Sequence, residues 1–423
     1  MNDVDSDSTP DKQLLMPSEW WSPLEDLAVP FWLRVPVRAR RPVRLCRLLL
    51  QSALTHVPVA WYRGKSHPSG RTARLLVAGA EPWVKYLPGR SFASAPQIEP
   101  VGSVPMWSLP ALLRRLRTSA DLTIARVDCL SAGLFFDATY LSVPEWTGTW
   151  LTLPKNPSTL LRASGSVRED LRRMRRHRLE MEVSHEEADF DLFYSTMYLP
   201  YVRSRYGELA GLGRPVKMRH FFRRGGIIFV RENGQRVAGQ FFVQHKRMFY
   251  LIVVGVNKGQ AQFVRNGALA ACYIFGINHA YALGCTHVDF GGNRSVLEDG
   301  VLRFKAKWGV RINEKRPSEF MLMVHWNRLD GLAGEFLSHT SLMFSESSGL
   351  SAIHSFGQDH PATQADVMAA CRTLWIDGLR YLYLVSPKGW SPGIQPPPQT
   401  ILLDSRVRPE SLQTGEWKRS RCF

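Results

Sequence analysis

The order of strand-like and helix-like segments after residue 225 limits the fold of this chain more than any other feature. Three strand-like segments come first, at residues 227–231, 236–245 and 248–255, with Asn233-Gly234 between the first two. Asn-Gly favours a tight hairpin turn, so these segments predict an antiparallel meander. An apolar helix over 267–283, with Gly284 at its C-cap, and a strand over 286–290 follow. This order predicts an α+β unit in which the helix packs on the sheet.

The meander and its helix lead into a stretch, residues 288–309, that combines glycines with charged and aromatic residues. It reads Val-Asp-Phe-Gly-Gly-Asn-Arg-Ser and ends in Phe-Lys-Ala-Lys-Trp-Gly. We expect a strand that breaks at two glycines, a polar loop over 293–300, and a short amphipathic helix that presents Lys305 away from Phe304 and Trp308. A final strand is expected over 320–325. Such a strand, turn and loop display polar groups beside a rigid sheet edge.

A second notable segment, residues 166–183, is rich in arginine. Ser166 and Glu169 have the spacing of a capping box, which predicts a helix that starts at Ser166. At helical spacing Val167, Leu171 and Met174 share one face, and the arginines crowd another: Arg168, Arg172, Arg175 and Arg176. This face is either a solvated basic surface or a site for phosphate or a polyanion, which guanidinium groups bind with bidentate geometry.

Composition narrows the class of protein without choosing a partner. The chain has 423 residues, which favours two or three domains, and its net charge of +17 favours polyanionic partners such as nucleic acid, phosphorylated donors or an anionic membrane surface. Its six cysteines are scattered, and its histidines show no metal spacing, so we expect buried thiols in a reducing compartment and no bound metal. The first residues lack the pattern of a signal peptide, which predicts a cytoplasmic location.

The sequence suggests five consecutive regions. We expect a disordered tail at 1–20, an N-terminal extension at 21–110, a first unit with the basic helix at 111–222, and a second unit at 223–334. A further helix over 364–379 and strand over 381–385 fall in a C-terminal extension at 335–423, which ends in a Pro-rich, basic tail.

The order of these parts resembles the FemAB-like members of the GNAT acyltransferase superfamily. The matching elements are the basic helix at 168–173, the helix of the second unit at 261–284, Asp289-Phe-Gly-Gly, and Phe304-Lys-x-x-Trp308-Gly309. The resemblance covers roughly residues 110–330. It implies an α+β fold of two tandem GNAT-like units, with mixed sheets, helices packed on them, and the active cleft between the units. It also implies that donor phosphates bind near the start of the second-unit helix, at Arg265, Asn266 and Gly267. The chain lacks the clean glycine-rich phosphate loop of the family at that place.

Acyl transfer to an amine needs a deprotonated nucleophile, stabilisation of the developing oxyanion and alignment of both substrates. We predict that Lys305 supplies the positive charge and that Asp289 accepts or orients the amine proton. Capping of the glycine turn is the structural alternative for Asp289. Other side chains are predicted to bind substrate: Asn293, Arg294, Trp308, Arg168 and Arg172. For Trp308 a place in the core is the structural alternative.

Other motif-based interpretations fail. Asp289-Phe-Gly matches the magnesium triplet of protein kinases, but the His-Arg-Asp catalytic loop and glycine-rich loop of that class are absent upstream. The chain also has neither a Gly-x4-Gly-Lys phosphate loop nor a Gly-x-Ser-x-Gly nucleophile elbow. Three hypotheses remain. The first is an N-acyltransferase that uses acyl-CoA or acetyl-CoA and an amine acceptor on a cell-envelope glycan, with peripheral contact to the inner face of the membrane. The second is an aminoacyl-tRNA-dependent transferase, and the third is a non-catalytic protein that docks on polyanions or membrane.

Overall fold

The computed structural model describes residues 54–80, 83–156, 158–161, 164–207, 212–313, 318–347, 349–357 and 359–412. Two compact units, whose segments alternate along the chain, make up this part. The meander unit comprises residues 148–291 and 305–311, and the six-stranded unit comprises residues 54–147, 292–304 and 312–412. The boundaries predicted at 222 and 334 do not coincide with the limits of these units. The tail predicted at 1–20 lies outside the described residues.

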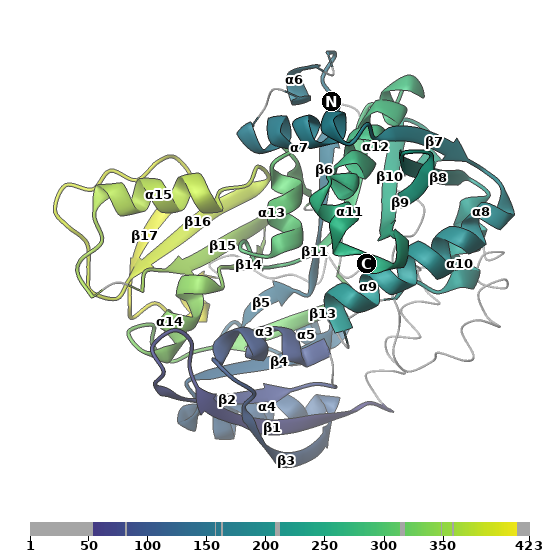
Figure 1. The fold of residues 1–423 in the computed structure, drawn as a ribbon. Coiled ribbons are helices and arrows are strands. Elements are labelled where there is room, and N and C mark those ends of the chain that lie inside the picture. Colours follow the sequence, from purple (N-terminus) through teal and green to yellow (C-terminus); the bar gives the residue numbers. More distant parts are fainter. Residues whose placement is uncertain are drawn as a thin grey trace. The chain divides into compact units, whose positions relative to one another are not determined.

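The predicted α+β class, with mixed sheets and helices packed on them, is confirmed (Figure 1). The described strands form three sheets. A seven-stranded sheet has the order β12-β6-β11-β10-β9-β8-β7, a six-stranded sheet the order β3-β1-β2-β4-β13-β5, and a four-stranded sheet the order β14-β15-β16-β17. Each sheet contains an antiparallel strand pair next to a parallel strand that a crossover connects. Parallel neighbours need a long connection of this kind.

The strands of the seven-stranded sheet follow the predicted meander. Their bounds are β6 Trp146–Thr152, β7 Glu180–Ser184, β8 Gly225–Glu232, β9 Gln235–His245, β10 Met248–Val256, β11 His287–Arg294 and β12 Arg311–Asn313. Strands β8, β9 and β10 pair antiparallel, and Asn233 and Gly234 make the first turn with positive φ angles of 50° and 81°. The Asn-Gly prediction is therefore confirmed.

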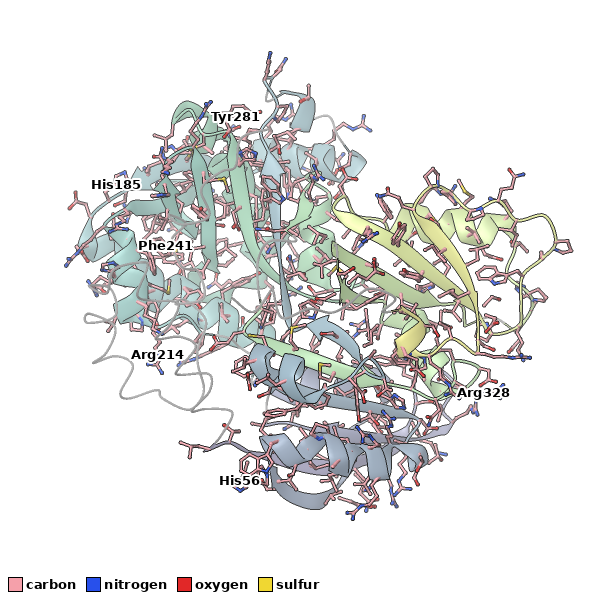
Figure 2. All side chains as sticks on the ribbon, turned by 180° about the vertical axis from the view of Figure 1, so that it is seen from behind. His56, His185, Arg214, Phe241, Tyr281 and Arg328 are labelled. Atoms are coloured by element: carbon pink, nitrogen blue, oxygen red, sulfur yellow. The ribbon has the colours of Figure 1, made fainter. Side chains whose placement is uncertain are left out.

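Helix α12 covers the meander as predicted. It spans Ala268–Ala282, contacts β8, β9 and β10, and ends before Gly284, whose φ is 68°. Its Gly276 lies so close to Leu251 of β10 that a Cβ there would be 2.8 Å from Leu251 Cδ2. The missing side chain thus lets the helix approach the sheet. Phenylalanines fill the interior of the unit, among them the fully buried Phe241 of β9 (Figure 2).

The remaining helices of this unit follow the apolar spacing of the sequence. Their bounds are α6 Ser158–Leu161, α8 Glu187–Leu192, a π-helical turn Phe193–Tyr198, α9 Leu199–Tyr206, α10 Pro215–Phe222 and α11 Ala261–Arg265. Helix α8, the π-helical turn and α9 follow one another directly, so they form one helical segment with a wider turn in its middle.

The arginine-rich helix α7 is shorter than predicted. It spans Gly165–Arg176, and its cap is Ser164, whose side chain accepts a hydrogen bond from the Val167 amide. The predicted cap Ser166 lies inside the helix, and the segment after Arg178 turns into β7. Ser164 and Ser166 both precede the apolar face, so the sequence alone does not separate the two caps.

The six-stranded unit has a sheet whose central strands are buried on both faces. Its strands are β1 His56–Lys65, β2 Thr72–Ala78, β3 Gln97–Pro105, β4 Leu122–Asp128, β5 Leu141–Pro144 and β13 Phe320–His325. Along β2, Leu75 and Val77 enter one apolar cluster and Leu76 and Ala78 the other. This alternation explains why the central strands are continuous apolar segments. The helices of this part are α3 Tyr86–Ser91, α4 Leu109–Leu116 and α5 Cys129–Phe135.

Strand β13 contradicts the predicted order. We expected it to complete the meander and helix as a final strand of the same unit. It instead pairs antiparallel with β4 and with β5, two strands from much earlier in the chain. Five of the six residues of β13 are buried. Buried backbone groups need hydrogen-bond partners, and a neighbouring strand on each side supplies them.

The four-stranded sheet also belongs to the six-stranded unit. Its strands are β14 Leu342–Glu346, β15 Gly349–Ser355, β16 Leu379–Ser386 and β17 Thr400–Asp404, with helices α14 Leu332–His339, α15 Gln364–Leu374 and α16 Pro409–Leu412. The helix and strand predicted at the C-terminal end are present as α15 and β16, but the helix ends at Leu374 and the strand begins at Leu379. Within the described residues, no helix has the length and apolar character needed to cross a membrane.

Candidate active site

The two residues predicted to be catalytic lie near the same glycine turn of the meander unit. Asp289 is on β11, and its Oδ1 accepts a hydrogen bond of 2.6 Å from the Gly291 amide. Lys305 is on helix α13, Gly300–Ala306, and a methyl group placed on Gly291 would lie 4.0 Å from its Nζ. Both side chains are buried, at 6% and 3% exposure. The structure therefore brings Asp289, Gly291 and Lys305 together, and we name them the Gly291 cluster.

The hydrogen bond from the Gly291 amide shows that Asp289 stabilises the glycine turn. This is the structural role that the sequence offered as the alternative to catalysis. Gly291 has a φ of 81°, a conformation that a side chain disfavours. An aspartate two residues before an amide commonly stabilises such a turn. This bond uses one carboxylate oxygen for structure, and the catalytic role of Asp289 stays a prediction.

The cluster lies where two parallel strands separate. Strands β10 and β11 pair at three positions only, and the last pair is Tyr250 with Asp289. Directly after Tyr250, the register of β10 against β9 shifts, because Ile252 forms a bulge. Residues Ile252, Val253 and Val254 are partly exposed, although they are apolar. The ladder between β10 and β11 therefore ends next to the glycine turn.

Tyr250 is a further polar residue at this place that the sequence did not suggest. It is buried, and burial, followed by the charge of Asp289, raises the pKa of its hydroxyl well above the usual value. The phenol is therefore protonated at neutral pH. A tyrosine inside an apolar strand is usually a core residue, so only the pairing of β10 with β11 reveals that it faces Asp289.

Two residues directly after helix α13 hold its end in place. Lys307 forms an ion pair with Asp170 of α7, and Trp308 has no exposed surface. Burial lowers the pKa of Lys307, and the bond to Asp170 opposes that shift. The ring of Trp308 is therefore a core side chain in this structure and not a surface on which a substrate stacks. This corrects its assignment as a substrate-binding residue and agrees with the core alternative.

Asn293 and Arg294 do not lie in an exposed loop as predicted. Both belong to β11, both are buried, and both fall within the six-stranded unit. Asn293 Nδ2 donates to the Thr147 carbonyl over 3.3 Å, and Arg294 Nη1 donates to Glu145 Oε1 over 2.9 Å. The strand continues through the two glycines, so the polar residues after them became part of the sheet.

Arg294 belongs to a buried ionic cluster. Glu145 accepts from Arg294 and, through both oxygens, from Arg126 at 3.2 and 3.1 Å. The Arg294 guanidinium also lies over the rings of Trp146 and Tyr86, at 4.1 and 4.9 Å from their centroids. We name Arg126, Glu145 and Arg294 the Glu145 cluster. Its contacts explain Arg294 as a structural residue.

The residues predicted to bind donor phosphates gather at the junction of α11 and α12. Gly267 is the N-cap of α12 with a φ of 99°, and a Cβ there would lie 3.2 Å from Arg173 Cβ of helix α7. Asn266 is buried, and its amide donates to Glu232 and accepts from Gln262. Arg265 is exposed. The junction of α11 and α12 thus lies against the basic helix α7. The Asn266 side chain, however, is used in hydrogen bonds to Glu232 and Gln262.

Arg168 and Arg172 are both exposed on α7. Arg172 forms an ion pair with Glu169, with 2.8 Å between Nη2 and Oε2. For Arg168, no ion pair occurs within the described part of the chain. Their proximity to a bound substrate stays a prediction.

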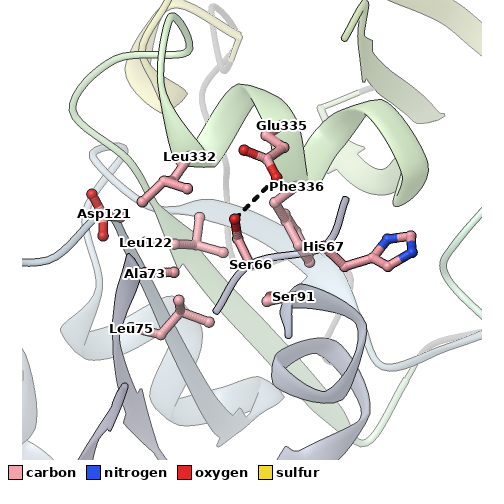
Figure 3. A pocket seen from close by; sticks show the side chains of 10 residues that line it. All are labelled: Ser66, His67, Ala73, Leu75, Ser91, Asp121, Leu122, Leu332, Glu335 and Phe336. Carbon is pink, nitrogen blue, oxygen red and sulfur yellow. Dashed lines mark hydrogen bonds between the residues drawn. The ribbon is translucent and has the colours of Figure 1, made fainter. Parts of the chain in front are cut away.

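A separate pocket lies in the six-stranded unit, and its Glu335 is already hydrogen-bonded. It encloses about 270 Å³, including its open mouth, between β2, α3 and α14 (Figure 3). The Glu335 carboxylate at its rim accepts from Ser66 Oγ at 3.0 Å, Ser69 N at 2.9 Å and Ser69 Oγ at 2.7 Å. Its apolar walls come from Ala73, Leu75, Leu122, Leu332 and Phe336. The acid is therefore already satisfied by hydroxyl and amide donors. Within the described residues no group of His, Cys, Asp and Glu side chains could hold a metal ion.

Comparisons with known proteins give structural similarity only. No protein-family model matches the sequence, and no curated protein matches it. Among solved structures, a FemX structure is similar, with 15% identity, coverage of 62% of this chain and 88% of that chain, and a TM-score of 0.33. The structure of L-PGS from Bacillus licheniformis has 12% identity, coverages of 62% and 83%, and a TM-score of 0.31.

A GCN5-related N-acetyltransferase from Sphaerobacter thermophilus has 12% identity, coverages of 61% and 77%, and a TM-score of 0.28. At these identities and TM-scores the similarities assign neither a fold family nor an activity to this chain.

Proposed function

We propose that this chain is an N-acyltransferase of the GNAT-like, FemAB-like kind. It would move an acetyl or longer acyl group from a coenzyme A thioester to an amine on a cell-envelope glycan or its precursor. The observation that carries the proposal is the position of Lys305, whose ammonium lies beside the turn that Asp289 and Gly291 form. This turn adjoins the separation of β10 and β11.

The separated strands suit an extended donor. An open backbone edge binds an extended ligand by strand addition, through its N–H and C=O groups. The arm of coenzyme A carries two amide groups and is extended, so β10 after Tyr250 is a suitable surface for it. The partly exposed Ile252, Val253 and Val254 would supply the apolar walls.

The start of α12 suits the donor phosphates. The first amide groups of a helix have no partner within the helix, and together with its dipole they favour an anion. Arg173 of α7 lies against the Gly267 cap, and Arg265 is exposed next to it in the chain. We propose that these two guanidinium groups and the helix start hold the phosphates, while Asn266 positions the turn.

In the proposed reaction the amine attacks the thioester carbonyl, a C–N bond forms and the C–S bond breaks. The charge that develops on the carbonyl oxygen is stabilised by the Lys305 ammonium in a buried site, where electrostatic stabilisation is strong. The amine loses one proton, for which the Asp289 carboxylate is the acceptor. The proton that Asp289 accepts from the amine then passes to the leaving thiolate, so the carboxylate is regenerated and the Tyr250 phenol stays neutral beside it.

The proposal is tested by incubating the full chain with acetyl-coenzyme A and a panel of amino sugars. Release of free thiol, together with an acetylated product detected by mass spectrometry, is the expected result. If the chain binds no acyl-coenzyme A in calorimetry and releases no thiol with any amine, the proposal is wrong.

One observation favours a second donor, an aminoacyl-tRNA. Helix α7 exposes several arginines, which would suit the phosphates of RNA. In that case charged tRNA replaces acetyl-coenzyme A in the assay, and its binding weakens steeply with added salt, because each phosphate contact releases counterions.

A further inference from the structure

We propose that the outer face of α7 docks this protein on an anionic lipid surface. This proposal does not depend on the proposed acyl transfer. The face carries Arg168, Arg172, Arg175 and Arg176, and all four are exposed. We name these four residues the α7 strip.

The inner face of helix α7 is packed against the unit, and this packing keeps the α7 strip turned outward. Val167 and Met174 are buried there, and the buried Asp170 forms an ion pair with Lys307. Helix α7 also contacts α12, against which Gly267 fits without a side chain. The helix therefore cannot roll to hide its arginines, and the four guanidinium groups extend over about 12 Å of helix.

Few acidic groups neutralise the strip. The acids of α7 are Glu169, which is partly exposed, and the buried Asp170, and Glu169 forms ion pairs with Arg172 and Arg173. Within the described residues, no carboxylate pairs with Arg168, Arg175 or Arg176. A helix that only needed solubility would not leave three arginines of one face unneutralised in a chain whose net charge is already +17.

The chemistry of the strip favours lipid phosphates over nucleic-acid bases. Helix α7 has no aromatic residue on which a base could stack and no Asn or Gln that could read a base edge. Guanidinium groups bind phosphate with paired hydrogen bonds. A short, straight row of them meets a flat layer of headgroups along its whole length, whereas the curved backbone of a duplex would meet it only in part. Such basic helix faces are typical of binding to anionic lipids.

The test uses the full chain and vesicles of phosphatidylcholine with or without phosphatidylglycerol, in a flotation assay without substrates. Each basic residue near an anionic surface contributes about fivefold to binding, so Arg175→Gln with Arg176→Gln is expected to weaken binding to the anionic vesicles about 25-fold. The same two positions changed to Lys should retain binding within about threefold, because the charge remains.

The matched control is Arg203→Gln with Arg205→Gln, two exposed arginines of α9 in the same unit. It removes the same charge and should leave vesicle binding nearly unchanged. Equal losses in both double variants, or no vesicle binding by the unaltered chain, would overturn the proposal. It would also be overturned if the α7 variant bound vesicles normally but lost affinity for RNA or for acyl-coenzyme A. Because flotation contains no donor, its outcome is separate from that of the transferase assay.

Discussion

The Gly291 cluster and the Glu145 cluster each contain residues of the stretch 288–309, yet they differ in how their charges are used. In the Glu145 cluster, two guanidinium groups donate to one carboxylate through three hydrogen bonds of 2.9 to 3.2 Å, and aromatic rings cover the cations. In the Gly291 cluster, a glycine turn with positive φ and the end of the ladder between β10 and β11 lie beside the charged groups. Dense mutual pairing indicates a structural cluster, whereas buried charge beside the end of a strand ladder is the arrangement that we propose for chemistry.

The largest expected effect tests the structural side of this comparison. Glu145→Gln removes the carboxylate that two buried arginines share, so the free energy of unfolding should fall by about 3–5 kcal/mol. Urea denaturation measures the change. Glu99→Gln is the control, because it breaks a partly exposed pair with Arg63 in the same unit and should cost less than about 1 kcal/mol. Equal costs would show that the Glu145 cluster has no special structural role.

The next effect tests the chemical side. Lys305→Ala removes the ammonium that we propose stabilises the oxyanion, and kcat for acyl transfer should fall about 10²–10³-fold. Lys305→Met serves as the control for packing, because it retains most of the apolar stem and removes only the charge. Similar losses in both variants would assign the effect to the charge. Near-normal turnover by the Met variant would refute the proposed role of Lys305.

The third prediction concerns how the stability of the six-stranded unit changes with pH, through the buried His354. Burial lowers the pKa of His354 to about 4, and the neighbouring Glu298 opposes this shift. An unfolded histidine titrates near pH 6.5, so the folded state favours the neutral ring. The stabilisation is complete above about pH 6.5 and is lost as the pH falls towards 4, by roughly 2–3 kcal/mol.

The measurement is the free energy of unfolding of the unaltered chain and of His354→Gln between pH 7 and pH 4. The difference in slope between the two proteins, rather than their absolute stability, isolates the histidine. Parallel curves would show that His354 does not carry the pH dependence.

The smallest expected effect sharpens the role of the glycine turn. Gly291 and Gly234 have the same φ of 81°, so each change to Ala should cost about 1–2 kcal/mol of stability. A methyl group at 291 would lie 3.5 Å from the Leu251 carbonyl and 4.0 Å from Lys305 Nζ, whereas at 234 it meets only Arg231. Only Gly291→Ala should therefore lower kcat, about tenfold or more, because it shifts the turn beside Lys305. Equal turnover of both variants in the transfer assay would separate the turn from the chemistry.

Local patterns predicted much of the fold. The hairpin at Asn233-Gly234, helix α12 with its C-terminal glycine, and the pair α15 and β16 follow from turn chemistry and apolar spacing. These features depend on residues that are close in the chain, which is why the sequence alone sufficed.

Strand partners that are far apart in the chain escaped prediction. Strand β13 pairs with β4 and β5, and no local pattern records that choice. The same reason applies at the site. From the local sequence, Arg294 was expected in a polar loop. In the structure it donates a hydrogen bond to Glu145, which is distant in sequence, and has a structural role. From the local sequence, Tyr250 would be taken for a core residue. The register of β10 against β11 places it next to Asp289, one of the two predicted catalytic residues.

The most direct test of the central claim measures acyl transfer and unfolding on two matched variants, Lys305→Met and Arg294→Met. Each removes one buried cation from the same stretch of sequence and retains an apolar side chain. We predict that the Lys305 variant stays as stable as the unaltered chain within about 1 kcal/mol but loses thiol release from acetyl-coenzyme A. The Arg294 variant should unfold more easily but transfer normally while folded. Normal transfer by the Lys305 variant, with transfer lost in the folded Arg294 variant, would contradict the assignment of chemistry to the Gly291 cluster.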